Sequence, residues 1–268
     1  MTLERTDNSS YSNNFRVILF VIISALFYSM STSAEVQHFS SGDRPVTLIE
    51  LYTSQGCSSC PPAERWMGEL KSDPRLWKEI IPVAYHVDYW DYIGWQDSFA
   101  KPEYSARQRS YRKEGVLSSV YTPGFVVNGE EWRGWFKQRP LPDGKRYPMQ
   151  LQLELDGAAV RASYPLLKSH GKKLTLNIVV LGVGLNVDVV RGENSGKRLQ
   201  QDFVVLEQRQ LSSSSGYWEV GLPDIKPPSG GRLALAAWVS DDGSSKPLQA
   251  AGGWIKQETD LPHGPLVR

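Results

Sequence analysis

Residues 46–70 read VTLIELYTSQGCSSCPPAERWMGEL, and this stretch decides the fold of the first half of the chain. It begins with a nearly continuous apolar run, Val46–Tyr52, which predicts a strand buried on both faces, as in a parallel sheet. It ends with residues 61–70, whose apolar members recur at i, i+3, i+4 and i+7, the spacing of one helix face. Between them lie Cys57 and Cys60, separated by two serines. A Cys-x-x-Cys pair at a strand-to-helix junction indicates redox chemistry.

The composition is that of a soluble globular protein. The chain has 268 residues, of which 40% are hydrophobic and 22% charged, and its length suits one or two domains. The net charge of +1 gives no general attraction to nucleic acid or acidic lipid, so no nucleic-acid partner is expected. The 2 cysteines cannot build a disulfide framework, so each has only the other to react with. We expect no cofactor.

Residues 1–34 are predicted to be an export signal. Their apolar run, residues 17–27, is too short for a membrane span of about 20 residues. Small residues 31–34 suit cleavage after Ala34, although an uncleaved anchor is the alternative. We therefore expect an exported protein, periplasmic or secreted, with no membrane association beyond this signal. In an oxidising compartment the cysteine pair forms a disulfide unless a reductant maintains it.

Residues 45–140 alternate strand and helix patterns. Ile80–Val87 is a second strand and completes a βαβ unit, which should be right-handed. A basic helix is expected at Pro102–Glu114, with its charged residues facing solvent. Asn128-Gly129 is a strong hairpin signal, with the returning strand at Glu130–Phe136. This order predicts an α/β domain.

From residue 149 the pattern changes to period two. Apolar and polar residues alternate in short runs separated by turn residues, which predicts an antiparallel β-sandwich-like domain over 149–257. Gly192-Glu193-Asn194 is interpreted as one of these turns, and a position at the domain interface is the alternative. Residues 141–148 form a Pro- and Gly-rich linker between the two domains. Residues 35–44 are interpreted as an N-terminal linker, and 258–268 as a loose tail.

Four pieces of the chain resemble a known family. They are Glu50–Ala63, His86–Trp95, Tyr121–Gly129 and Arg191–Asn194. In these motifs the chain is similar to an uncharacterised family of predicted secreted thioredoxin-like proteins (domain of unknown function family 1223). The resemblance covers nearly the whole mature chain. It implies an α/β thioredoxin-like domain followed by an antiparallel β-sandwich-like domain, and it implies no known reaction.

One region departs from the thioredoxin-like pattern. Thioredoxin-like domains close with a helix after the last hairpin, and here that region is Phe136–Pro142, a poor helix sequence. Either the helix is lost or the β domain covers that face instead.

The two cysteines have distinguishable expected roles. Cys57 precedes the helix N-terminus, where the helix dipole and unpaired N–H groups stabilise a thiolate, so it is the expected nucleophile. Cys60 lies one turn further on and would resolve a mixed disulfide. A static disulfide and half of a zinc site, which needs four ligands, are the alternatives. The strand–Cys-x-x-Cys–helix context favours redox use.

The likeness to thioredoxin-like folds implies roles for two further positions. Thr122-Pro123 is expected to contain a cis peptide bond and to present Thr122 to a substrate; an ordinary trans proline is the alternative. Glu50 lies within the first strand and is expected to be a buried acid of raised pKa that accepts a proton during resolution. One extra residue separates it from the first cysteine compared with thioredoxin. The alternative is a paired Glu50 with no such role.

The aromatic and acidic loop His86–Asp97 follows a strand, so it should lie at the carboxyl edge of the sheet beside the cysteines. Trp90 and Trp95 are candidates for a substrate-facing wall, and aromatic packing is the alternative. His86, Asp88 and Asp91 are of residue types that bind metals. Metal binding is the weakest of these interpretations, and no metal site is expected.

The sequence as a whole predicts an exported thiol–disulfide oxidoreductase acting on a protein or a small thiol. The expected catalytic residues are Cys57, Cys60 and Glu50, and the expected substrate-binding residues are Thr122, Pro123, Trp90 and Trp95. The main alternative is a non-catalytic secreted binding or structural protein with a static disulfide. A metal-handling thiol protein is a third. The direction of electron flow and the oligomeric state stay open.

Overall fold

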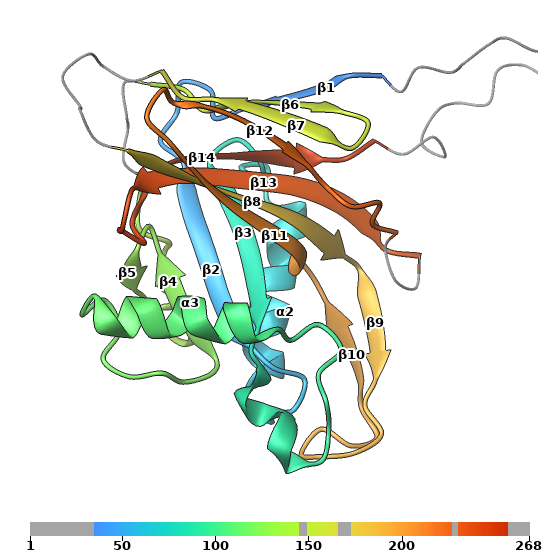
Figure 1. Cartoon of the computed structure of the whole chain (residues 1–268). Helices are drawn as coiled ribbons and strands as arrows, with labels where there is room; N and C mark the ends of the chain where they lie inside the picture. Colours follow the sequence, from blue (N-terminus) through green and yellow to red (C-terminus); the bar gives the residue numbers. More distant parts are fainter. Residues whose placement is uncertain (1–34, 145–148, 166–172, 227–229, 257–268) are drawn as a thin grey trace, which may run out of the picture. The chain divides into compact units, whose positions relative to one another are not determined.

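The computed structural model describes residues 35–144, 149–165, 173–226 and 230–256. The predicted signal peptide and the predicted tail lie outside the described residues. The described residues from Val36 to Lys256 form one compact unit (Figure 1).

Strands dominate the described part of the chain. They are β1 (Gln37–Ser40), β2 (Thr47–Thr53), β3 (Ile80–His86), β4 (Gly124–Val127), β5 (Glu130–Glu131), β6 (Gln152–Asp156), β7 (Ala159–Ser163), β8 (Leu174–Val183), β9 (Leu185–Asp188), β10 (Arg198–Gln201), β11 (Val204–Ser213), β12 (Tyr217–Gly221), β13 (Arg232–Asp241) and β14 (Pro247–Trp254). The α-helices are α2 (Pro61–Glu69) and α3 (Pro102–Lys113), and the 3-10 helices are η1 (Leu70–Ser72), η2 (Asp88–Ile93) and η3 (Trp135–Lys137).

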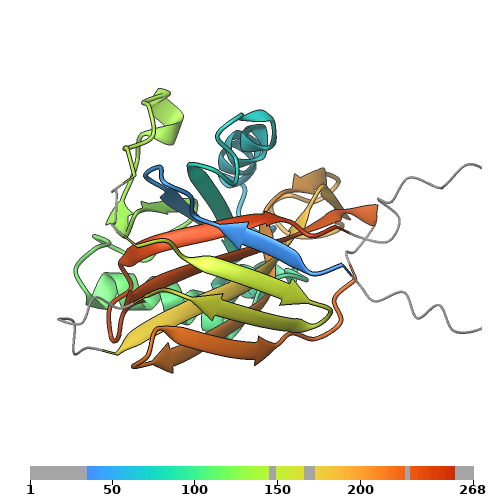
Figure 2. The ribbon, with the colours of Figure 1, turned by 90° about the horizontal axis from the view of Figure 1, so that it is seen from above.

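The strands form three sheets. The largest has eight strands in the order β14-β13-β8-β11-β3-β2-β4-β5. Within it, β3 pairs in parallel with β2 and with β11, and the other neighbours are antiparallel. A second sheet has the order β1-β6-β7-β12, and β9 and β10 form a separate hairpin. Figure 2 shows the second sheet lying across the strands of the first.

The expected fold class, an α/β thioredoxin-like domain followed by an antiparallel β-sandwich-like domain, is wrong. Strands from both halves of the sequence form one eight-stranded sheet, because β11 adds to β3 through the pair Val204 and Ala84. The first strand of the described chain, β1, pairs with β6 of the later half. The molecule is therefore a mostly β structure in which two helices support part of a large mixed sheet. An apolar pattern identifies a strand, but the edge on which that strand pairs depends on distant segments.

Alternation along β2 explains how the sheet is covered. Ile49 and Leu51 pack with Ala63 and Met67 of α2 on one face. Tyr52 packs with the tyrosines of α3 on the other. Further along the sheet, β8 and β13 bury one face with α3 and the opposite face against the four-stranded sheet. Each strand therefore lies between two apolar layers, which accounts for the nearly continuous burial of β2, β3 and β8.

The individual elements agree better with the sequence than their assembly does. The predicted first strand, both helices and the Asn128-Gly129 hairpin form close to the expected positions. The region after that hairpin has only η3, so the closing helix is lost. The returning strand is shorter than expected, and β1 occupies part of the expected N-terminal linker.

Candidate functional site

The two cysteines form a disulfide between the end of β2 and the start of α2. Cys57 and Cys60 have Cα atoms 5.4 Å apart, and the chain has no free cysteine. Cys60 is the N-cap of α2, and its carbonyl accepts the N–H of Ala63 at 2.9 Å. The Cys57 N–H donates to the Ser54 carbonyl at 3.1 Å and so closes a turn after the strand.

Several N–H groups at this helix start already have partners. Pro61 follows the N-cap and has no N–H to offer an anion. The Cys60 N–H donates to the Cys57 carbonyl at 3.2 Å, and the Ser58 N–H donates to Glu193 at 3.0 Å. The Cys57 sulfur lies 3.3 Å from the Ser59 hydroxyl. A thiolate at Cys57 would therefore depend on that hydroxyl more than on the helix N-terminus.

Both sulfur-bearing residues are buried. Cys57 is 1% exposed and Cys60 is 0% exposed, so neither residue is open to solvent in this structure. The 3-10 helix η2 lies against the preceding residue, Gly56. A Cβ at that glycine would lie 3.2 Å from the Ile93 side chain and 3.3 Å from that of Trp90. A side chain at position 56 would therefore press η2 outward by a few tenths of an ångström.

A second segment covers the cysteines from the other half of the sequence. We call residues 189–197, which join β9 to β10, the cap loop. The buried Asn194 amide donates to the carbonyls of Gln55 and Cys57, each at 2.9 Å. The Lys197 ammonium donates to the Asn194 carbonyl oxygen at 2.8 Å, which fixes the orientation of the amide. In Figure 1 the β9–β10 hairpin extends to the end of the sheet where β2 leads into α2.

The cap loop also contacts the aromatic loop. Gly192 has φ +76, a conformation that favours glycine, and a Cβ there would lie 3.2 Å from Trp95. Gly192-Glu193-Asn194 is therefore a turn, as interpreted, and it also covers the cysteine pair.

A buried polar cluster lies beside the disulfide. The His86 and Asp97 side chains are 2.7 Å apart and both 0% exposed, and Asp97 also accepts the Gln55 N–H at 2.8 Å. Glu64 of α2 accepts hydrogen bonds from the Thr53 hydroxyl at 2.6 Å and from the Gln201 amide at 3.1 Å. These residues come from β2, α2, β3, β10 and the aromatic loop, so the fold gathers them from distant parts of the sequence.

The cluster contains groups with shifted pKa values. Burial raises the pKa of the Glu64 carboxyl, although the nearby His86 and the hydrogen bonds to the carboxyl partly oppose this. Burial acts against protonation of His86, but the Asp97 carboxylate outweighs it and raises the pKa of the imidazole. Burial acts to raise the pKa of Asp97, but the charge and hydrogen bond of His86 outweigh it and lower that pKa. The cluster therefore favours an ionised Asp97 beside a protonated His86, and it holds a second carboxyl, Glu64, that retains its proton more readily.

The structure brings most of the predicted substrate-binding residues to this site. The Thr122–Pro123 peptide bond is cis, as predicted. The Trp90 indole N–H donates to the Thr122 hydroxyl at 2.7 Å, and Trp90 also lies against Gly56. The Trp95 indole N–H donates to the Gln55 side chain at 2.9 Å. Trp90 therefore contacts both the segment that leads to the cysteines and the proline loop, and Trp95 contacts the segment that leads to the cysteines.

Glu50 lies elsewhere. Its carboxylate faces α3, where Arg107 donates to it at 2.7 and 3.0 Å, and the hydroxyls of Tyr52 and Tyr111 donate to the same oxygens. Arg107 is buried in this pair and is an exception to the expected solvated helix face. The sequence alternative of a paired glutamate describes this geometry, and the buried acid on the helix of the cysteines is Glu64.

The contributions of Glu64, Asp97 and the cap loop to the site were missed. Glu64 follows Cys60 by four residues, so both lie on one helix face. A carboxylate among the apolar positions of that face was the available signal. Nothing in the sequence places Asn194 beside the cysteines, because the contact joins residues 137 positions apart.

The possible metal ligands of the aromatic loop have other partners. Asp88 accepts a hydrogen bond from Ser105, Asp91 accepts the Asp97 N–H, and His86 pairs with Asp97. Among the described residues no group of three or more His, Cys, Asp or Glu could hold a metal ion.

No helix in the part of the chain that the structure describes is long and apolar enough to cross a membrane.

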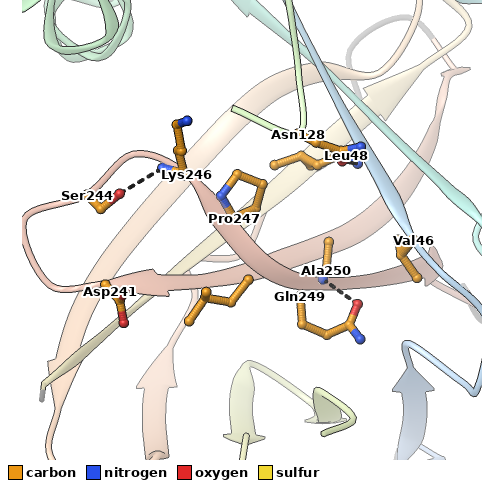
Figure 3. Close-up of a pocket in the computed structure, with 10 residues that line it drawn as sticks. Val46, Leu48, Asn128, Asp241, Ser244, Lys246, Pro247, Gln249 and Ala250 are labelled. Atoms are coloured by element: carbon orange, nitrogen blue, oxygen red, sulfur yellow. Dashed lines mark hydrogen bonds between the residues drawn. The ribbon is translucent and has the colours of Figure 1, made fainter. Parts of the chain in front are cut away.

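A pocket lies at the opposite end of β2 from the disulfide (Figure 3). Its walls include Val46, Leu48, Asn128, Lys246 and Gln249. The Gln249 side chain accepts the Ala250 N–H at 3.0 Å, so one of its polar groups is already used inside the wall. The pocket is separate from the cysteine site.

Comparison with known proteins identifies the family. The sequence model of a family described as "Protein of unknown function (DUF1223)" matches residues 48–240. The chain belongs to this family. The match spans the cysteine pair, the aromatic loop and the cap loop. No curated protein matches the chain.

The solved structures to which the chain is similar in fold include the following two. The crystal structure of protein AGR_C_4864 from Agrobacterium tumefaciens has a TM-score of 0.55 and 23% identity, and the likeness covers 82% of this chain and 99% of that one. HBP35 of Porphyromonas gingivalis has a TM-score of 0.49 and 14% identity, over 84% of this chain and 81% of that one. The first likeness concerns the fold alone. It extends over both halves of the sequence, as the eight-stranded sheet does.

Proposed function

We propose that this family member is an exported thiol–disulfide oxidoreductase that uses Cys57 and Cys60 on a protein or small thiol substrate. The observation that carries the proposal is the position of the disulfide. The chain's two cysteines are joined at the start of a helix, beside a buried cluster of carboxyl and imidazole groups. Disulfide exchange transfers protons as well as electrons, so it can use such groups, whereas a static cross-link has no need of them.

The small size of the closed loop supports the same proposal. In the chain-entropy model, a disulfide across a sequence separation of 3 stabilises a protein by about 2 kcal/mol, less than the 3 kcal/mol or so of a 15-residue loop. A pair placed only as a cross-link would stabilise more if it joined distant segments. The short spacing of Cys57 and Cys60 instead lets one cysteine resolve a mixed disulfide formed on the other.

The chemical roles follow from the positions. Cys57 precedes the N-cap, and its sulfur contacts a hydroxyl that can donate to a thiolate, so it is the attacking or attacked sulfur. Cys60 is the fully buried partner and resolves the mixed disulfide. Trp90 and the Thr122-Pro123 loop border the site and would contact the substrate chain. Export, proposed from residues 1–34, would place the pair in an oxidising compartment.

One observation favours a second function. Both cysteines are almost completely buried, which suits a static disulfide in a non-catalytic binding or structural protein. The oxidoreductase proposal therefore requires that the cap loop or η2 moves away from Cys57 during exchange.

Trapping in the native compartment tests the proposal. A Cys60→Ser variant cannot resolve a mixed disulfide, so Cys57 should retain its partner in a covalent complex visible on non-reducing gels. The matched Cys57→Ser variant should retain none. Equal capture by the two variants, or none by either, would refute the oxidoreductase proposal and leave the static disulfide. Mass spectrometry of the complex identifies the substrate.

A further inference from the structure

Glu64 and Cys60 occupy adjoining positions on the buried face of α2. They are four residues apart, a spacing that stacks side chains on one helix face, and the Glu64 N–H donates to the Cys60 carbonyl at 3.1 Å. Cys60 is 0% exposed and Glu64 7% exposed. We propose that Glu64 exchanges a proton with the Cys60 sulfur as the disulfide opens and closes. This inference rests on the proposed oxidoreductase function and assigns it a proton acceptor.

The surroundings of Glu64 fit this task. Two neutral donors, the Thr53 hydroxyl and the Gln201 amide, hold the carboxyl in place without neutralising it. No ion pair with a lysine or arginine involves Glu64 among the described residues. A carboxyl held in this way can take up and release a proton without breaking a salt bridge, unlike Glu50, whose charge is fixed by Arg107.

The charged groups packed around Glu64 come from several elements. His86 of β3 and Asp97 of the aromatic loop form a pair nearby, and they act on Glu64 in opposite directions, with His86 the stronger influence. On the next turn of α2, Gly68 lies against Asp202, which is paired with Lys71 at 2.7 Å. Reduction would add a further negative group, a Cys60 thiolate, one helical turn from Glu64. Two negative groups cannot both ionise at close range in a buried site, so they share one proton.

The step balances as follows. An incoming thiolate attacks Cys57 and forms a new S–S bond, while the Cys57–Cys60 bond breaks and its electron pair leaves on Cys60. The protonated Glu64 carboxyl gives its proton to the Cys60 sulfur and becomes a carboxylate. In the reverse direction the carboxylate removes the Cys60 proton, Cys60 attacks Cys57, and the substrate leaves as a thiolate. The reductant is the substrate thiol itself.

A two-step reaction of the reduced protein tests the inference. A symmetrical aromatic disulfide releases one coloured thiolate when Cys57 attacks it and a second when Cys60 resolves the mixed disulfide. Glu64→Gln keeps the size of the side chain and its bond from Thr53, and it should slow the second release by about 100-fold near neutral pH, the usual contribution of a general base. The first release should not change. Glu64→Asp should recover part of the rate, and the exposed Glu69→Gln on the same helix should behave as wild type.

The pH profile separates proton exchange from a structural effect. With Glu64 present, the rate of the second release should level off at a lower pH than in Glu64→Gln, whose Cys60 must ionise without help. Equal second-step rates in Glu64→Gln and wild type would overturn the inference, as would equal slowing of both steps. If the second step depends on Glu64 but no partner is captured by Cys60→Ser, the proposed function alone fails. If neither thiolate is released, both fail.

Discussion

The cap loop is expected to control access to the disulfide, and Asn194→Ala is the change that tests this. The asparagine is fully buried, and its amide donates to the carbonyls of Gln55 and Cys57 at 2.9 Å each. A neutral hydrogen bond contributes about 1 kcal/mol net, so losing both should weaken the closed position of the loop by about 2 kcal/mol. Since 1.4 kcal/mol corresponds to tenfold, the open fraction should rise by about 30-fold.

The assay is the rate at which a small dithiol reduces the disulfide, followed by alkylating the released thiols and measuring the mass. If opening is fast and precedes reduction, Asn194→Ala should be reduced about 30-fold faster than wild type, in proportion to the open fraction. Ser195→Ala is the matched control, because its hydroxyl donates only within the loop, to Val190 at 3.1 Å. It should be reduced at the wild-type rate.

The rate must also come from local opening and not from unfolding. Global unfolding responds steeply to urea, whereas opening of one loop exposes little surface and responds weakly. The reduction rate of Asn194→Ala should therefore change little in low urea. Equal rates for Asn194→Ala and wild type, or a steep rise with urea, would refute the idea that the cap loop gates the cysteines.

Three further predictions concern charged groups. Glu193→Gln should lower the pKa of the Cys57 thiol in the reduced protein, because it removes a carboxylate that is held by the N–H of the next residue, Ser58, and whose own pKa that bond lowers. The pH dependence of alkylation measures the thiol pKa, and an unchanged value would contradict the prediction. Asp97→Asn should lower the free energy of unfolding by about 3–5 kcal/mol, because it leaves His86 without its partner. The pKa of His86 is raised in the folded state, so protonated His86 stabilises the wild-type protein fully at pH values below its unfolded-state pKa. This stabilisation is lost as pH rises through the folded-state pKa. Urea titrations at several pH values should show this loss in the wild type and not in Asp97→Asn. Arg107→Met should lower the free energy of unfolding by about 3–5 kcal/mol, because it leaves Glu50 unpaired. The rate at which the disulfide is reduced should not change. A slower rate would indicate that Glu50 takes part in the redox reaction.

The assembly of the sheet shows why the fold prediction failed while its parts succeeded. The apolar run of β2, the helical spacing of α2 and the Asn128-Gly129 turn are local properties, and each formed near its expected place. The pairing of β3 with β11 joins segments more than a hundred residues apart. A local pattern does not indicate which distant strand a segment will pair with. The sequence therefore indicated two successive domains, whereas strands from both halves of the chain form the eight-stranded sheet.

The site divides in the same way. The sequence alone determined that Cys57 and Cys60 have only each other to pair with and that they lie between a strand and a helix. The cis Thr122–Pro123 bond was expected from the likeness to thioredoxin-like folds, and the structure contains it. Only the tertiary structure decided which buried acid lies on the side of the pair and what covers the pair. Glu50 turns toward α3 because side chains alternate along a strand, whereas Glu64 stays with the cysteines because a helix repeats every turn. The cap loop reaches them because β9 and β10 extend from a sheet built by both halves of the chain.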